Sequence, residues 1–159
     1  MNEQVEVHIR RGVPGLSLPD LPPGSHPYPD TAVDFAKIAR EAGLTVTFQD
    51  ADRKDRVYLT HNAADCWLPS IVIGAESLIA IGSGLATHLV IQYLRGISDR
   101  QVFLHLECTV THADGSTETT LLEGPRETVL ESLREFEVRN IEQARGGSAE
   151  AGHPDEQSG

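Results

Sequence analysis

Apolar and polar residues alternate along three segments of the chain, residues 5–9, 44–48 and 102–110. A period of two is typical of a strand that buries one face. A further strand is expected at residues 56–60, where β-branched and aromatic residues dominate. Residues 31–42 predict a helix capped by Asp30 or Thr31, with apolar residues on one side and Gly43 placed to end it. The chain therefore begins with a strand, a helix and a strand.

The dipeptide Asp114-Gly115 follows the third alternating segment and predicts a β-hairpin with a two-residue type I′ turn. The return strand is expected over residues 116–123. In this register Cys108 faces Leu121 on the inner side of the hairpin. Cys108 is then expected to be a small core residue.

Residues 69–95 form the longest apolar run, PSIVIGAESLIAIGSGLATHLVIQYLR, and predict a single helix about 40 Å long. One side of this helix is small or polar, and a strip of small residues lets another backbone come close. We expect this side to be an interaction stripe, packed either within the domain or against a partner. The stripe consists of Glu76, Ala80, Ser83, Gly84, Thr87 and His88.

The same run has a second interpretation, because residues 71–91 are long enough to cross a bilayer. Their Ile, Leu and Val residues favour insertion, whereas Glu76, His88 and two central glycines oppose it. The two contributions nearly cancel. A buried helix of a soluble domain is the preferred interpretation, and a marginal membrane span is the alternative.

The remaining segments complete one domain over residues 1–145. Residues 11–30 contain six prolines and three glycines, which predicts an irregular surface loop. A final amphipathic helix begins near Pro125 and buries a stripe that includes Val129, Leu133 and Phe136. Residues 146–159 hold no large apolar side chain, so we expect a disordered tail.

Charge narrows the classes of partner. The chain has 159 residues and a net charge of −11, which argues against binding to nucleic acid or to anionic lipid. The two cysteines make neither a disulfide framework nor a zinc spacing, and no apolar segment with a charged start opens the chain. The cytoplasm is the expected location.

Candidate chemistry is sparse. His61, Asp65 and Cys66 can each ligate a metal, but their spacing matches no zinc pattern. His105 and Glu107 share the predicted outer face of the hairpin and could act as a base with its orienting carboxylate, yet no nucleophile stands beside them. No phosphate-binding loop, dinucleotide fingerprint or nucleophile elbow is present. We therefore expect no catalytic residue, no metal and no cofactor.

Two motifs, IAIGSGLATHLVIQYLRG and THADGSTETTLLEGPRETVLESL, lie within a succession of elements that extends from about Val5 to Phe136. In this arrangement the chain resembles the effector-associated constant component family of bacterial conflict systems. The resemblance implies a small non-enzymatic component, encoded beside variable effectors such as hydrolases, that acts in their regulation or assembly.

Together, these patterns predict an α+β domain. A small sheet, made of the strand-helix-strand unit and the Asp-Gly hairpin, packs on the long glycine-rich helix, and an amphipathic helix ends the domain. The expected function is that of a binding and regulatory component for an effector protein. A membrane-associated small protein and a small enzyme with an unrecognised site are the alternatives.

Overall fold

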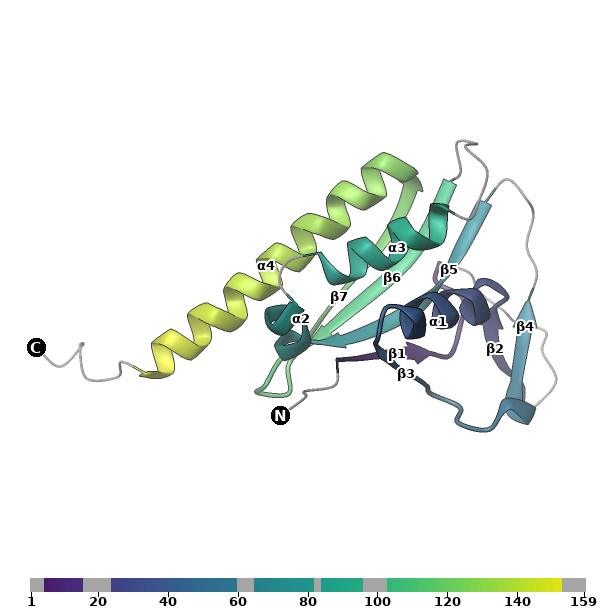
Figure 1. Ribbon diagram of the computed structural model, residues 1–159, viewed down its shortest axis with the longest axis horizontal. Coiled ribbons are helices and arrows are strands. Elements are labelled where there is room, and N and C mark those ends of the chain that lie inside the picture. Colours follow the sequence, from purple (N-terminus) through teal and green to yellow (C-terminus); the bar gives the residue numbers. More distant parts are fainter. Residues whose placement is uncertain (1–4, 16–23, 60–64, 82–83, 96–102, 153–159) are drawn as a thin grey trace, which may run out of the picture.

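The computed structural model describes residues 5–15, 24–59, 65–81, 84–95 and 103–152, and only the backbone for 147–152. It confirms an α+β fold, in which the described helices and strands follow one another as shown in Figure 1. The elements are β1 (Glu6–Arg10), β2 (His26–Pro29), α1 (Thr31–Glu41), β3 (Thr45–Phe48), the 3-10 turn η1 (Arg53–Asp55), β4 (Arg56–Leu59), β5 (Asp65–Gly74), α2 (Ala75–Ile81), α3 (Leu85–Arg95), β6 (Phe103–Thr111), β7 (Thr117–Pro125) and α4 (Arg126–Gly152).

The main sheet has five strands in the order β3-β1-β5-β6-β7. Strands β1 and β3 pair in parallel, which confirms the predicted strand-helix-strand unit around α1. Strand β5 is antiparallel to β1 and parallel to β6, and β6 and β7 form the predicted antiparallel hairpin. A second sheet of two parallel strands, β2 and β4, lies beside the main sheet (Figure 1).

The helices form one layer against one face of the main sheet, since α1, α3 and α4 pack on one another and on its strands (Figure 1). The core lies between these two layers. Most of the expected core side chains are buried there, which confirms the predicted faces of the alternating strands, while Val5 is only half-buried. The buried members are Val7, Phe48, Leu85, Leu89, Leu104, Leu106, Val110 and Leu133.

The prediction of one helix over residues 69–95 is wrong at its N-terminal end. Residues 65–74 form β5, which lies between β1 and β6 in the middle of the sheet. Helices cover one face of this strand, so residues such as Ile71 and Ile73 are fully buried. An uninterrupted apolar run is consistent with a buried strand as well as with a helix. The β-branched residues after Pro69 are the local signal that favours the strand.

The rest of the run is also not one helix. It forms α2 and α3, whose axes differ in direction by 74°. Gly84, just before α3, has a φ of 94°, which lies outside the helical region. No single helix among the described residues is long and apolar enough to span a membrane, although α2 and α3 meet the length and composition test as a bent pair.

The predicted interaction stripe is therefore divided between two helices. Glu76 and Ala80 are exposed on α2, and His88 is exposed on α3. Thr87 is buried at the start of α3, and Ser83 lies outside the described residues. Nothing lies within 4 Å of a Cβ built on Gly84, so this glycine does not serve the close approach that the sequence predicted.

The hairpin forms, but its register differs by one residue from the prediction. Cys108 pairs with Thr120, not with Leu121, which is exposed. The turn has three residues, because the N–H of Gly115 donates to the carbonyl of His112 and His112 pairs with Ser116. A type I turn followed by a residue with positive φ, here Gly115 at 89°, is the usual form of a three-residue connection. Cys108 is fully buried, as predicted.

Two further boundaries differ from the predictions. Residues 26–29, assigned to an irregular loop, form β2, which pairs with β4. Helix α4 begins one residue after Pro125 and continues to Gly152, where a disordered tail was expected. Residues 146–148 are Gly, Gly and Ser, which have low helix propensity, and only Ala, Glu and Ala at 149–151 favour the extension. The rest of the predicted tail, residues 153–159, lies outside the described residues.

Candidate functional site

The face of the main sheet that the helices leave uncovered is named here the open face. Its side chains belong to the alternate positions of β1, β5, β6 and β7 and are mostly polar or aromatic. The set comprises His8, Arg10, Trp67, Ser70, Val72, His105, Glu107, Thr109, Thr119, Leu121 and Glu123.

Residues 11–15, named here the strap, lead from the end of β1 across part of the open face. The N–H of Gly12 donates to the carbonyl of Pro27, 2.7 Å away, so the start of the strap lies beside β2. Further along, a Cβ built on Gly15 would lie 2.7 Å from Oε2 of Glu123, on β7. Val13 and Pro14, between these two points, are buried. The strap thus spans the sheet from β1 to β7.

A hollow of about 590 Å³ lies on the open face beside the strap. Its lining combines two arginines, several uncharged polar groups and one carboxylate. These residues are Arg10, Arg11, Gly12, Pro27, Gln49, Ser70, Glu107 and Thr119. In the floor, the hydroxyl of Ser70 donates to Oε1 of Glu107 over 2.5 Å, and the hydroxyls of Thr109 and Thr119 lie 2.8 Å apart.

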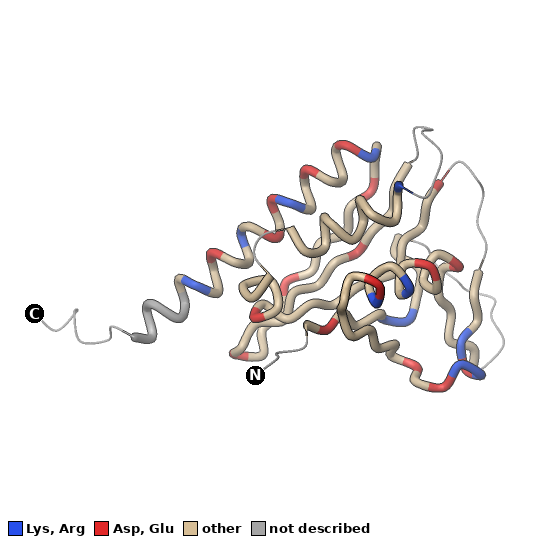
Figure 2. Tube along the Cα trace, viewed as in Figure 1, with Lys and Arg blue, Asp and Glu red and all other residues tan. Residues whose placement is uncertain are grey.

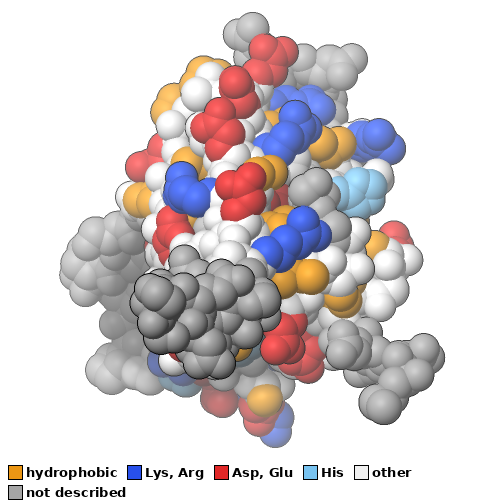
Figure 3. All heavy atoms as spheres, turned by 90° about the vertical axis from the view of Figure 1, so that its left-hand side faces the viewer, with side chains coloured by type: hydrophobic (Ala, Val, Ile, Leu, Met, Phe, Trp, Pro, Cys, Tyr) orange, Lys and Arg blue, Asp and Glu red, His pale blue; other side chains and the backbone are white. Residues whose placement is uncertain are grey.

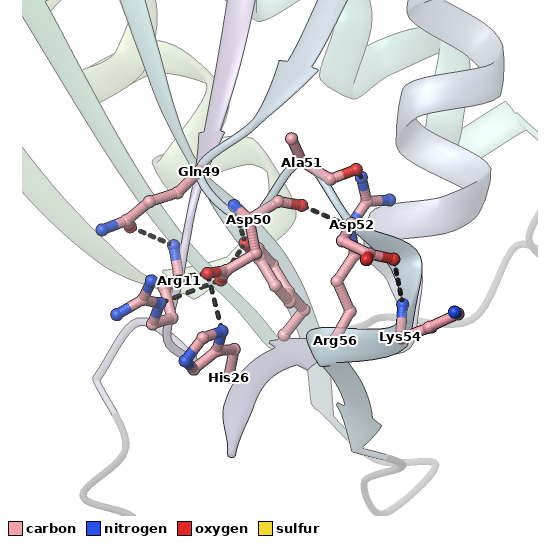
Figure 4. Close-up of polar contacts among 9 residues, drawn as sticks. Arg11, His26, Gln49, Asp50, Ala51, Asp52, Lys54 and Arg56 are labelled. Carbon is pink, nitrogen blue, oxygen red and sulfur yellow. Dashed lines mark hydrogen bonds and ion pairs between the residues drawn. The ribbon is translucent and has the colours of Figure 1, made fainter. Parts of the chain in front are cut away.

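One side of the hollow is fixed by the carboxylate of Asp50, which is 7% exposed. Arg11 donates to this carboxylate through Nε at 2.9 Å and Nη2 at 2.5 Å, a bidentate pairing. The hydroxyl of Tyr28 donates over 2.8 Å, and Nδ1 of His26 lies 2.7 Å from Oδ1. Figure 4 shows the side chains of Arg11 and His26 meeting at the carboxylate of Asp50. Arg11, directly after β1, and His26, at the start of β2, are therefore both tied to the residues that follow β3.

The charge on Asp50 is stabilised by these contacts. The Arg11 hydrogen bonds, followed by that from Tyr28, lower the pKa of Asp50 to about 2, against the effect of burial. Burial, assisted by the negative Asp50, raises the pKa of Tyr28 to about 12. At neutral pH the carboxylate is ionised and the phenol keeps its proton, so the cluster is an ion pair with a neutral donor.

Arg56 adds a second layer to this corner (Figure 4). Its Nε donates to the carbonyl of Asp50 at 2.7 Å, its Nη2 donates to the carbonyl of Ala51 at 3.1 Å, and its guanidinium lies 3.9 Å from the centre of the Phe48 ring. The N–H of Arg11 donates to the side-chain oxygen of Gln49, which leaves the amide nitrogen of Gln49 as a donor beside the hollow.

Arg10 differs from its neighbour. It is exposed at the rim of the hollow and makes no hydrogen bond or ion pair with another described residue. Burial, followed by the positive charge of Arg10 two residues later on the same face of β1, lowers the pKa of His8.

Elsewhere, charges of both signs are interleaved. Figure 2 shows acidic and basic residues alternating along α4, and both kinds again close together around η1 and the start of β4. At the end of the molecule where α4 terminates, acidic and basic side chains lie side by side among single apolar ones (Figure 3). Arg139 on α4 pairs with Glu118 on β7 at 2.8 Å, rather than with Glu135 one turn earlier.

His105 and Glu107 share the open face of the hairpin, as predicted, but His105 is not exposed there. His105 is 6% exposed, because its ring stacks on Trp67 with centroids 3.5 Å apart and planes inclined by 2°. Its Nδ1 donates to Oε2 of Glu123 at 2.5 Å. Its Nε2 makes no hydrogen bond within the described part of the chain and lies 3.8 Å from Oδ2 of Asp65. A histidine between two carboxylates is thus held beneath the surface of the open face.

The remaining candidates do not assemble into a reactive site. Cys66 and Cys108 are buried, and burial raises the pKa of both thiols, that of Cys66 to about 11. Asp65 lies near His105, whereas His61 is outside the described residues. No group of three or more potential metal ligands occurs among the residues that the structure describes.

Sequence reasoning missed the hollow and the cluster around Asp50. Arg11, His26, Tyr28 and Asp50 are separated by up to 39 positions and lie at strand ends or in a segment without periodicity. The local signal was an acidic residue, Asp50, two positions after the predicted strand at residues 44–48. Comparison of the chain with protein-family models, curated proteins and solved structures gave no match.

Proposed function

We propose that this protein is a non-enzymatic binding and regulatory component that holds or tunes an effector protein, and that it contacts this partner through the open face around the hollow. The observation that carries the proposal is a preformed polar hollow whose rim holds Arg10, an exposed side chain that pairs with no other residue in the described part of the chain. Sites for recognition are concave and largely formed in advance. The motifs that resemble effector-associated constant components support an effector, encoded beside this protein, as the partner.

The states of the described acidic and sulfur groups favour binding over chemistry. Asp50 is held by Arg11 and Tyr28, and Glu107 accepts the hydroxyl of Ser70. A thiol of raised pKa is a poor nucleophile, which applies to both cysteines. The Asp50–Arg11 pair and the Ser70–Glu107 hydrogen bond fix side chains that line the hollow and leave Arg10 at its rim for a partner.

The proposal is tested by co-expressing the tagged chain with each protein encoded next to it and measuring complex formation by size-exclusion chromatography. A stable complex with one of them is expected, and Arg10→Glu should weaken it at least tenfold because a like charge replaces the free cation. Arg40→Glu on α1 makes the same charge change on the helical layer and should leave the complex intact. Complexes with none of the neighbours would contradict the proposal.

The expected interaction stripe is a competing contact surface. Its exposed members Glu76, Ala80 and His88 lie on α2 and α3, away from the hollow. In the same assay, loss of the complex with His88→Glu and not with Arg10→Glu would assign the partner to that surface.

An enzyme is the second candidate, favoured by one observation. His105 is oriented by Glu123 through Nδ1, the arrangement that positions a general base, and Nε2 has no hydrogen bond among the described residues. This candidate predicts a turnover that His105→Ala abolishes while the complex with the partner persists. The buried position of Nε2 favours a structural role instead.

A further inference from the structure

The hollow on the open face has a charge pattern that selects one chemical class of ligand. Its rim carries donors on one side, namely the free guanidinium of Arg10, the exposed part of Arg11 and the amide nitrogen of Gln49. Its floor carries an acceptor, the carboxylate of Glu107. Oε1 of Glu107 accepts the hydroxyl of Ser70, and Oε2 can accept a hydrogen bond from another donor. A ligand that fits both sides has a negative group at one end and an N–H at the other.

The spacing of the strands sets the length of such a ligand. Arg10 pairs with Ser70 across β1 and β5, and Ser70 pairs with Glu107 across β5 and β6. Two strand spacings separate the positions of Arg10 and Glu107 by about 10 Å. Two extended peptide residues span about 7 Å. The side chains of Arg10 and Glu107, which face the ligand from its two ends, span the rest of the distance of about 10 Å.

The Glu107 carboxylate also selects the kind of anion. Glu107 repels a dianionic phosphate more strongly than a single carboxylate, and a carboxylate matches the planar donors of an arginine. Backbone N–H groups next to that carboxylate supply the donor that Glu107 can accept. Both features occur together in a peptide.

We propose that the hollow binds a peptide carboxylate, either a C-terminus or an acidic side chain, with Arg10 as its main partner and Glu107 accepting an N–H of the same peptide. Arg11 and Gln49 add donors, and Asp50 holds Arg11 in place. The proposal rests on the proposed function, in which the peptide belongs to the effector.

The test uses the full 15N-labelled chain and small probes followed by NMR. N-acetyl-glycyl-glycine, which carries a C-terminal carboxylate, should shift the amides of the hollow residues in a saturable way, with a Kd on the order of 1–10 mM. Its C-terminal amide should bind at least tenfold more weakly. The α-amide of N-acetyl-glutamate tests the side-chain source, and the tighter of the two acids identifies which carboxylate the site prefers.

Matched variants separate the roles of the two residues. Arg10→Gln should weaken the binding of N-acetyl-glycyl-glycine at least tenfold. Arg10→Lys should recover part of the lost affinity, and Arg40→Gln should leave the affinity unchanged. Glu107→Gln keeps an acceptor for Ser70 but lowers the negative charge. This variant should weaken the binding of N-acetyl-glycyl-glycine two- to fivefold. Acetate, which has no N–H, should bind with the same or a higher affinity.

Three results would overturn the proposal: no localised shifts, equal binding of acid and amide, or inorganic phosphate binding more tightly than either acid. These results are distinguishable from failure of the proposed function. If the probes do not bind while an effector complex forms and is weakened by Arg10→Glu, only the carboxylate site is wrong. If the probes bind and no effector complex forms, the site stands and the proposed function fails.

Discussion

The carboxylate of Glu137, on α4, accepts both the backbone N–H and the hydroxyl of Thr87, at 2.8 and 2.6 Å from Oε1. Its other oxygen accepts the N–H of Ala86 at 2.9 Å. Glu137 is fully buried. The first N–H groups of a helix have no partner within it, and the positive end of the helix dipole favours an anion. A side chain 50 positions later thus caps α3.

Replacing this cap should cost much of the stability of the domain. Glu137→Ala leaves several buried donors without an acceptor and should lower the free energy of unfolding by about 3 kcal/mol, measured by urea denaturation. Glu137→Gln keeps one strong acceptor and should cost about half as much. Glu135→Ala, on an exposed site of the same helix, should change the value by less than about 0.5 kcal/mol. Equal effects of Glu137→Ala and Glu135→Ala would refute the capping role.

Gly84, at the break before α3, provides a second test. Its φ of 94° is a conformation that other residues adopt with strain, although a Cβ there would meet no other atom. Gly84→Ala should therefore destabilise the protein by about 1–2 kcal/mol through the backbone alone. Gly146, exposed in α4, is the matched control, and Gly146→Ala should stabilise by about 0.5–1 kcal/mol. In thermal unfolding, Gly84→Ala should lower the melting temperature and Gly146→Ala should raise it.

The parts of the fold that sequence predicted are those in which one face of an element is buried. Alternation in residues 5–9 and 102–110 identified β1 and β6 and their core positions, because the two faces of a strand then meet different surroundings. Strand β5 lies in the middle of the sheet and carries a continuous apolar run at residues 71–73, so its pattern does not distinguish a strand from a buried helix.

The site was much less predictable than the fold. The polar side of β1 and β6 was visible in the sequence, but whether it stays exposed depends on residues that come from elsewhere. Trp67 covers His105 through the pairing of β5 with β6, and that pairing was unknown while β5 was assigned to a helix. The register of β7 depends on one residue in the turn, and a shift of one residue exchanges its two faces.

The cysteines should be unreactive in the folded protein. Both are buried, and a thiol with a pKa of about 11, as burial produces at Cys66, is almost fully protonated at pH 8. Labelling with a thiol reagent at this pH should be at least about a hundredfold slower in the native state than in urea. Ala113→Cys, exposed at the tip of the hairpin, supplies an accessible thiol that should react at the unfolded rate. Rapid labelling of two native thiols would contradict the buried positions.

Asp50 predicts how stability depends on acid. Its pKa is about 2 in the folded protein and about 3.8 for a free side chain, chiefly because Arg11 donates to it. A lowered pKa means that the folded state binds the proton less tightly than the unfolded state does. The contribution of Asp50 is then complete above about pH 4 and is lost as the pH falls toward 2. Its full size is about 2 kcal/mol.

This dependence can be isolated by comparing the wild type with Asp50→Asn, which removes the charge at nearly constant volume. The difference in the free energy of unfolding should be largest at pH 5–7 and should shrink by about 1–2 kcal/mol between pH 4 and pH 2. Tyr28→Phe removes one donor to Asp50 and should raise the pKa of Asp50. The contribution of Asp50 to stability should then be lost at a higher pH than in the wild type. Glu142→Gln, on the exposed side of α4, should give a difference near zero at every pH. A difference for Asp50→Asn that stays constant down to pH 2 would mean that the carboxylate is not paired with Arg11 in solution, and the arginine side of the hollow would then lack its support.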